Sequence, residues 1–175
     1  RAEDPLMTTG PRHLVTESWE APEIGRPGAA SFGLNATHGL YASWSGCSPR
    51  GARGFPVYRP EHWAFAGTGM KTGDSIPGMV GWEYHGQPAH EIPSLEVLAS
   101  GTAWVGGTTP QSWASSIYET DGGGIVANVS TIWWAQGLSS PPGHTLPWSH
   151  GSRPHGPDDR VQTITRNLLR RALKR

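Results

Sequence analysis

The stretch SWASSIYETDGGGIVANVSTIWW, residues 112–134, predicts a β-hairpin around which the rest of the chain can be arranged. Residues 112–120 alternate between apolar and polar side chains well enough for a strand with one buried face. The DGGG that follows, residues 121–124, favours a tight turn, because glycine adopts the positive φ that such turns require. Residues 125–134 are typical of a returning strand, so the two segments are expected to pair through a longer loop.

The C-terminal residues predict one amphipathic helix. Pro157 is expected at its first position, and Asp158 and Asp159 in the first turn suit the positive end of the helix dipole. An apolar stripe at helical spacing follows, made of Val161, Ile164, Leu168, Leu169 and Ala172. The basic residues Arg166, Arg170, Arg171, Lys174 and Arg175 complement the dipole, and we interpret them as a solvated face rather than a phosphate site.

The other segments predict short elements between long loops. Residues 1–30 are expected to be polar, Pro-interrupted coil, and residues 48–56 an exposed loop. Strands are expected at residues 40–44, 57–67 and 79–85, with Pro60 limiting the second to a sheet edge or a break. Residues 94–101 are compatible with a strand or a helical turn. The fold class is therefore mixed α/β, with short strands, long Gly/Pro-rich loops and one C-terminal amphipathic helix.

Composition excludes several classes of function. The 14 basic and 14 acidic residues balance, so neither a nucleic-acid partner nor a membrane surface is expected. The 24 Gly and 16 Pro would suggest disorder, but nine Trp supply large units of buried area. No apolar run has the length of a membrane span, and we expect a cytoplasmic protein. The sequence opens on Arg1 rather than Met, which suggests part of a longer polypeptide.

The lone cysteine and the histidine clusters give weak signals. Cys47 has no partner for an internal disulfide, and the Pro-Arg loop after it favours an inert residue over a nucleophile. Three histidines in a Pro/Gly loop lack the Cys or paired carboxylates of a metal centre, which favours a solvated loop; they are His144, His150 and His155. The pair His85 and His90 is interpreted in the same way.

The tryptophans allow two interpretations. Most are expected to be core or loop anchors, but two or three exposed ones could stack on a ligand. Trp133 and Trp134 are adjacent, so in a strand they would face opposite sides, and at most one could share a given surface.

The stretch from Tyr58 to Gly86, YRPEHWAFAGTGMKTGDSIPGMVGWEYHG, gathers most of the chemistry. Glu61 and His62 are neighbours and would point in opposite directions in an extended segment. Glu83 and His85 are two residues apart and would share one face of a strand. A carboxylate and an imidazole beside Trp can act as an acid/base pair, because partial burial raises a glutamate pKa toward neutrality. Spacing alone leaves the function of this stretch open.

The same stretch resembles the HW-F-GTG-K-GD--P-LVG-E-D signature of the N,N-dimethylformamidase large-subunit family, in its C-terminal region. The likeness continues through SSIYETDGGGIVANVSTIWWAQGL, residues 115–138, and PDDRVQTITRNLLRRALKR, residues 157–175. It covers residues 44–173, so we divide the chain into a poorly matched coil, 1–33, and a family-like C-terminal domain, 34–175, that is itself part of a longer domain.

The resemblance implies a bacterial, oligomeric hydrolase that cleaves the C–N bond of a small formamide. It implies an amidotransferase-like α/β domain and an iron ion held by two Tyr and a Glu, with ligands expected upstream of this chain. Glu83 is then the candidate acid/base and His62 a candidate contact to substrate or to iron-bound water, while Trp63, Thr68 and Trp82 are candidate substrate-binding residues. Many members carry an acidic residue where this chain has Ala66, which leaves the identity of the acid/base open.

The expected partners are a small amide substrate and the remainder of the large subunit or a small partner subunit. The isolated chain is expected to be inactive. Two alternatives remain open at this point: a Trp-rich carbohydrate-binding module, and a catalytically inactive accessory domain.

Overall fold

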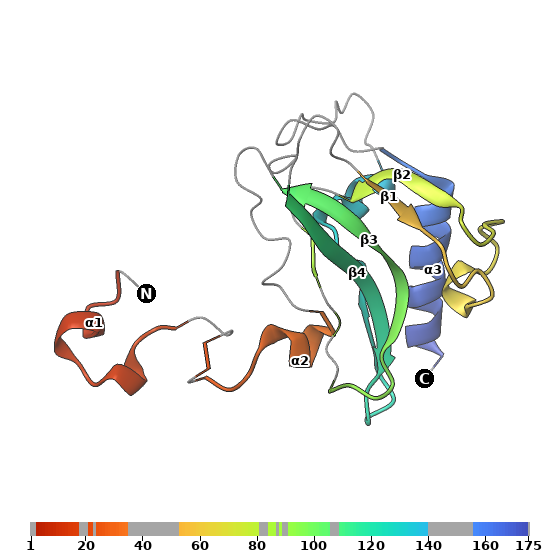
Figure 1. The fold of residues 1–175 in the computed structure, drawn as a ribbon. Coiled ribbons are helices and arrows are strands. Elements are labelled where there is room, and N and C mark those ends of the chain that lie inside the picture. Colours follow the sequence, from red (N-terminus) through yellow and green to blue (C-terminus); the bar gives the residue numbers. More distant parts are fainter. Residues whose placement is uncertain are drawn as a thin grey trace.

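The computed structural model describes residues 3–17, 21–22, 24–34, 53–80, 84–86, 88, 91–105, 109–139 and 156–174. In chain order the elements are α1 (Leu6–Thr9), η1 (Arg12–Leu14), α2 (Gly28–Phe32), β1 (Arg53–Pro56), η2 (Trp63–Phe65), β2 (Ser75–Val80), β3 (Glu96–Val105), β4 (Thr109–Glu119), β5 (Ile125–Asn128), η3 (Ile132–Gly137) and α3 (Asp159–Leu173), where η is a 3₁₀ helix. The strands form two antiparallel sheets, β1–β2 and β3–β4–β5 (Figure 1). The mixed α/β class is confirmed.

The predicted hairpin is β4–β5. Its strands pair from Ser116↔Asn128 to Glu119↔Ile125, and the turn between them places Gly123 at φ 80°. The Thr120 hydroxyl accepts a hydrogen bond from the Gly124 N–H at 3.0 Å and closes the loop. The segment that allowed two interpretations, residues 94–101, lies mostly in β3, which pairs with β4 along its whole length.

The returning strand is shorter than expected, and this overturns the prediction for the tryptophan pair. β5 ends at Asn128, and Ser130 turns the chain with a φ of 70°. The Thr131 hydroxyl then caps η3 by accepting from the Trp133 N–H. Trp133 and Trp134 lie in this 3₁₀ helix and are both buried, 1% and 8% exposed, rather than alternating across a strand.

The prediction of a strand at residues 57–67 is also wrong. Pro60 begins a turn, closed by a hydrogen bond from the His62 N–H to the Arg59 carbonyl, and η2 follows. The edge strand is instead β1, within the stretch expected to be a loop. Its partner β2 starts before Met79, so Pro77 lies inside a strand of a two-stranded sheet, where its missing N–H is tolerated.

Helix α3 begins later than expected. Asp158 is its N-cap and accepts a hydrogen bond from the Arg160 N–H at 2.9 Å, so Pro157 precedes the cap and Asp159 alone is acidic in the first turn. Val161 and Ile164 are buried and Leu168 packs against the core. Leu169, however, is 61% exposed, so the apolar stripe turns away from the core toward the end of the helix.

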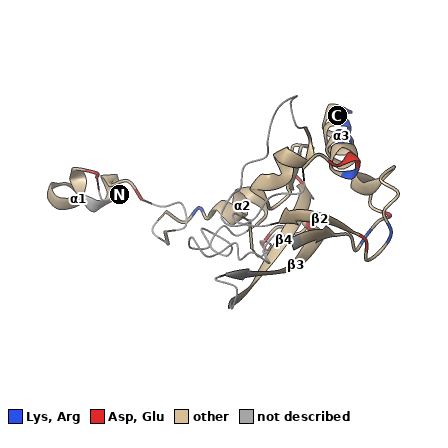
Figure 2. Ribbon diagram, turned by 90° about the horizontal axis from the view of Figure 1, so that it is seen from above, with Lys and Arg blue, Asp and Glu red and all other residues tan. Residues whose placement is uncertain are grey.

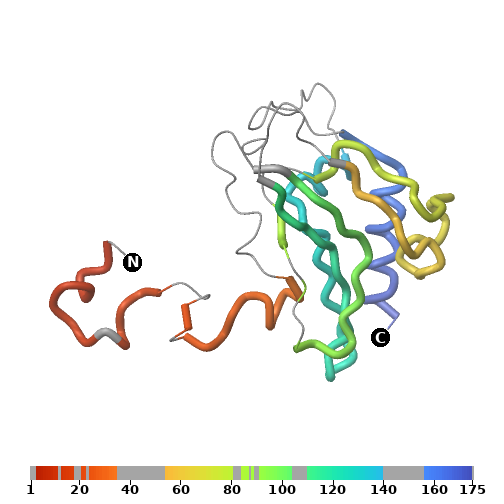
Figure 3. Tube along the Cα trace, in the orientation of Figure 1, coloured from red at the N-terminus to blue at the C-terminus, as the bar shows by residue number. Residues whose placement is uncertain are grey.

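One core joins both sheets to α3 and η3. It includes Phe55, Met79, Trp113, Trp134 and Val161, and the Phe55 ring lies 5.8 Å from that of Trp113 and 5.3 Å from that of Trp134. Figures 1 and 3 show α3 on one side of the three-stranded sheet and the N-terminal residues extending from the other side. Among the described residues, no helix has both the length and the apolar character needed to cross a membrane.

The N-terminal residues expected to be coil contain the short helices α1 and η1 and the start of α2. Several predictions concern positions outside the described residues: the strand at 40–44, Cys47, Trp19, Trp44, Trp148, and the histidines His90, His144, His150 and His155.

Candidate functional site

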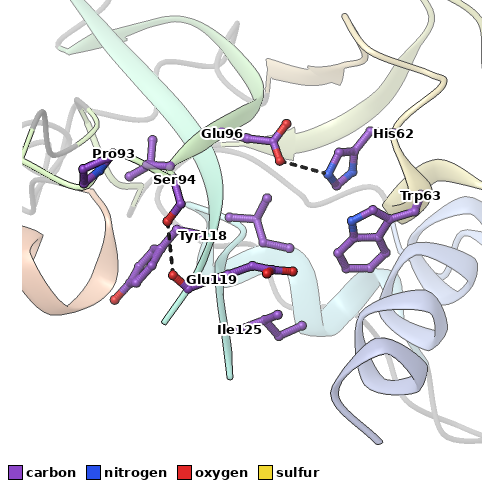
Figure 4. Close-up of a pocket in the computed structure, with 10 residues that line it drawn as sticks. His62, Trp63, Pro93, Ser94, Glu96, Tyr118, Glu119 and Ile125 are labelled. Atoms are coloured by element: carbon purple, nitrogen blue, oxygen red, sulfur yellow. Dashed lines mark hydrogen bonds and ion pairs between the residues drawn. The ribbon is translucent and has the colours of Figure 1, made fainter. Parts of the chain in front are cut away.

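An open depression of about 390 Å³ lies where η2 approaches the ends of β3 and β4 (Figure 4). Two of the residues predicted for the site, His62 and Trp63, form one wall of it. The rest of the lining comes from Pro93, Ser94, Leu95, Glu96, Ile117, Tyr118, Glu119 and Ile125. The depression thus combines an apolar floor with an imidazole, an indole and two carboxylates.

His62 is fixed by the 3₁₀ helix that it caps. Its Nδ1 accepts a hydrogen bond from the Ala64 N–H at 3.2 Å, which assigns the proton of the neutral ring to Nε2. The imidazole also packs against Trp63, with ring centroids 5.0 Å apart. Asn167 of α3 holds the same turn, donating to the carbonyls of Ala64 at 3.0 Å and Ala66 at 2.8 Å. Helix α3 therefore holds the turn that His62 caps.

The other nitrogen of His62 faces Glu96. Nε2 is buried, has no hydrogen-bond partner among the described residues, and lies 3.8 Å from Glu96 Oε1. The second carboxylate oxygen accepts from Arg59 at 2.5 Å, and this pair keeps the carboxylate beside the ring. Burial lowers the pKa of His62 below its usual 6.5, against the opposing effect of the Glu96 charge. The ring is therefore neutral near pH 7 and presents an N–H donor.

Trp63 and Glu119 form the side of the depression nearest α3. The Arg171 guanidinium lies over the Trp63 ring, 5.6 Å from its centroid, and also donates to Glu119 Oε1 at 3.1 Å. One cation thus joins the indole to the carboxylate. Arg171 therefore covers one face of the Trp63 ring.

Thr68 does not line the depression. Its hydroxyl donates to the Phe65 carbonyl at 2.8 Å and accepts from the Met70 N–H at 3.2 Å, which closes the turn after η2. Ala66 is exposed at the end of η2 and is likewise absent from the lining. Glu83 and Trp82 lie outside the described residues, so their place in the site stays a prediction.

A second polar cluster holds the chain just after Glu83. The His85 N–H donates to Ser130 twice, to its carbonyl at 2.8 Å and to its hydroxyl at 3.0 Å. The Ser130 hydroxyl in turn donates to the His85 carbonyl at 2.9 Å. Asn128 Oδ1 accepts from the Ser130 N–H at 2.9 Å, and its amide group contacts His85 Nδ1 at 2.7 Å. A left-handed, buried serine at this point is a strained conformation that the network maintains.

The described residues do not form an iron site of the kind that the resemblance implies. No group of three or more His, Cys, Asp or Glu side chains converges among them. Their tyrosines are committed elsewhere and do not converge: Tyr58 donates to the Ser100 carbonyl, Tyr118 to the Ser31 carbonyl, and Tyr84 to Gln111.

The tryptophans whose side chains are described are mostly internal. Trp113 and Trp133 are each 1% exposed and Trp134 is 8% exposed, so these three cannot stack on a sugar ring. Trp63 is partly exposed. The carbohydrate-binding alternative therefore rests on Trp63 and on tryptophans outside the described side chains.

Glu96, Glu119 and Asn167 were not predicted as site residues. Glu96 lies in the segment 94–101, whose assignment was left open, and Glu119 lies near the end of the strand predicted at residues 112–120. Neither position indicated a shared depression. Asn167 lies in the C-terminal motif, within a helix interpreted as scaffold, and its two hydrogen bonds to the η2 turn depend on tertiary packing.

Comparison with known proteins identifies the family. A family model described as N,N-dimethylformamidase beta subunit-like, C-terminal, matches residues 1–148. The chain belongs to this family. No curated protein and no solved structure matched it.

The dimethylformamidase-like match confirms both the family and the C-terminal region expected from the sequence motifs. The matched range contains the whole Tyr58–Gly86 stretch and β3 to η3, and also includes residues 1–33. It ends before α3. The family match therefore indicates that the chain is part of a dimethylformamidase-like subunit and associates with other parts of such a subunit.

Proposed function

We propose that this chain is the C-terminal part of the large subunit of an amidohydrolase that cleaves the C–N bond of a small formamide such as N,N-dimethylformamide. The observation that carries the proposal is the family match across residues 1–148, which includes every block of the signature stretch. Water and the amide are consumed, and formic acid and an amine are released. We place the enzyme in the cytoplasm, working with the rest of the large subunit or with a small partner subunit.

Amide hydrolysis requires a proton to move from the attacking water to the departing nitrogen, because an amine leaves poorly until it is protonated. We assign this transfer to Glu83, which takes the proton from water and returns it to the nitrogen. The iron implied by the family would be bound by residues other than those described here, and no step is assigned to it. The isolated chain is therefore expected not to turn over the substrate.

The depression supports a role in substrate contact. His62 Nε2–H is a buried donor of the kind that holds an amide carbonyl, and it is oriented by the hydrogen bond at Nδ1. A substrate reaches Nε2 only when the Glu96 carboxylate moves aside, and this side chain is 41% exposed. Trp63 would contact the methyl groups of the amide on the apolar side of the depression.

The test is Glu83→Gln in the complete subunit, with release of formate and dimethylamine as the readout. General acid/base catalysis contributes roughly 10²–10⁴-fold, so kcat should fall by at least about 100-fold with little change in KM. Glu91→Gln, at an exposed position beyond the motif, is the matched control and should leave both constants unchanged. Full activity in Glu83→Gln would reject the acid/base assignment.

A further inference from the structure

The outward face of α3 carries apolar and basic residues that nothing in the described part of the chain covers. Leu169 and Leu173, one helical turn apart, are 61% and 84% exposed. Beside them Arg166, Arg170 and Lys174 form a second ridge at the same spacing, all exposed. Within the described residues no carboxylate pairs with these three cations. Such a face, apolar with a cationic border, suits an apolar segment that carries negative charge.

The N-terminal arm, residues 3–27, has this chemistry. It contains five acidic and two basic residues, a formal charge of −3, whereas residues 159–174 contain five basic and one acidic residue, a formal charge of +4. Met7, Leu14 and Ile24 on the arm are 40%, 59% and 41% exposed. None of its described side chains is buried. Figure 2 shows acidic positions in red on the arm and basic positions in blue on α3.

The arm does not lie against the helix of its own chain. Figure 1 shows the arm and α3 on opposite sides of the three-stranded sheet. The arm joins the folded body at α2, on the side of the sheet away from α3, where Tyr118 donates to the Ser31 carbonyl and Asn128 to the Phe32 carbonyl. A second copy can bring its arm to this helix without crossing the sheet.

We propose that the outward face of α3 binds the N-terminal arm of a second copy of this chain, so that two copies exchange arms. Each copy gives one arm and receives one, which makes a closed dimer with a twofold axis. The three exposed apolar residues of the arm cover Leu169 and Leu173, and its carboxylates face Arg166, Arg170 and Lys174. This inference is independent of the proposed catalytic role, because it involves neither Glu83 nor the depression.

The first measurement is the mass of the 175-residue chain in solution over a range of concentrations, by light scattering or sedimentation. The wild type should dimerise, and added salt should weaken the dimer because it screens the charge attraction. Arg170→Glu should raise the dimer dissociation constant about tenfold, as expected for a reversed charge at an interface. Lys71→Glu reverses an exposed charge on another loop and should leave it unchanged. A wild type that stays monomeric would overturn the proposal.

Two variants with reversed charges distinguish a dimer formed by arm exchange from any other dimer. One variant reverses the helix ridge (Arg166→Glu, Arg170→Glu, Lys174→Glu), and the other reverses arm charges (Glu3→Lys, Glu17→Lys). Each alone should be monomeric where the wild type is dimeric, with an unchanged circular dichroism spectrum. An equimolar mixture should restore the dimer as a heterodimer, because each arm then meets a helix of opposite charge. If the mixture stays monomeric, or if deleting residues 1–27 leaves the dimer intact, the proposal fails.

Discussion

At the scale of single residues, His62 serves two purposes at once. Its Nδ1 caps η2 and thereby fixes the turn that carries Trp63, while Nε2–H remains the only polar hydrogen of the ring. Because Nδ1 is committed to a backbone amide, His62 is suited to donate a hydrogen bond from Nε2 and is poorly placed to act as a general base. We therefore propose that His62 positions the turn and donates a hydrogen bond to the substrate.

The buried imidazole makes stability depend on pH. Because burial lowers the pKa of His62 in the folded state, the unfolded state binds more protons between that value and the usual 6.5. The free energy of unfolding should therefore rise as the pH rises through this window. The protein should lose this added stability as the pH falls through the same window. His62→Asn keeps a capping side chain without a titrating ring and should flatten this dependence. Urea denaturation between pH 5 and 7.5 measures the free energy of unfolding of the wild type and of His62→Asn.

Glu96→Gln is the companion variant for this prediction. The Glu96 charge raises the pKa of His62, so its removal should lower that pKa further, and a ring NMR titration of the histidine would show this directly. If the stability of His62→Asn changes with pH as steeply as that of the wild type, the pH dependence comes from another group.

Only part of the site could be predicted at this scale. His62 and Trp63 carry a recognisable motif, and the structure places both on one depression. Glu96 and Glu119 lie far away in the sequence, and each meets the depression because β3 and β4 pair and η2 packs beside them. Side-chain convergence of this kind depends on tertiary packing, which local spacing does not encode.

At the scale of elements, the contact between η3 and α3 depends on a glycine. Trp134 Nε1 donates to Thr165 Oγ1 at 2.9 Å, and the Asp158 N–H donates to the Gly137 carbonyl at 2.9 Å, so two hydrogen bonds join the two helices. A Cβ at Gly137 would lie 2.8 Å from Val161 Cγ1 and 3.0 Å from Met79 Cε, and both of these side chains are completely buried.

Gly137→Ala should destabilise the protein by about 1–3 kcal/mol, because added volume in a packed core forces neighbouring side chains to shift. Gly122→Ala is the control, since its Cβ would meet only Thr120 Oγ1, at 4.0 Å, and its φ is not positive. That control should be neutral or slightly stabilising through the unfolded state. Thermal unfolding compares the two, and equal melting temperatures would contradict the proposed packing.

The elements that were predicted correctly are those with local signals. The β4–β5 hairpin has alternation on both sides of a glycine turn, and α3 has an apolar stripe with acidic residues at its start. The errors arise where a local pattern competes with tertiary structure. Residues 132–137 are rich in strand-forming side chains, yet Ser130 turns the chain and Thr131 caps a 3₁₀ helix, so that both tryptophans enter the core.

At the scale of the whole molecule, residues 28–34 attach the N-terminal arm to the body. Leu34 is 1% exposed and bridges Pro88, and Gly33 takes a φ of 77° beside Ser116, where a Cβ would lie 2.9 Å from the serine hydroxyl. The described part of the arm before this anchor contains no buried side chain. Folding energy should therefore be concentrated after residue 27, with the arm free to serve association.

Deleting residues 1–27 should consequently leave the melting temperature of the monomer nearly unchanged, whereas deleting residues 1–34 should lower it strongly. Leu34→Ala tests the same boundary without a truncation and should cost about 2–5 kcal/mol, as expected for a fully buried leucine. Leu14→Ala, at a position that is 59% exposed, is the matched control and should cost little. The comparison is made at a concentration below dimerisation, because association itself raises stability. A large loss from removing residues 1–27 under these conditions would mean that the arm folds onto its own body, which would also remove the basis for arm exchange.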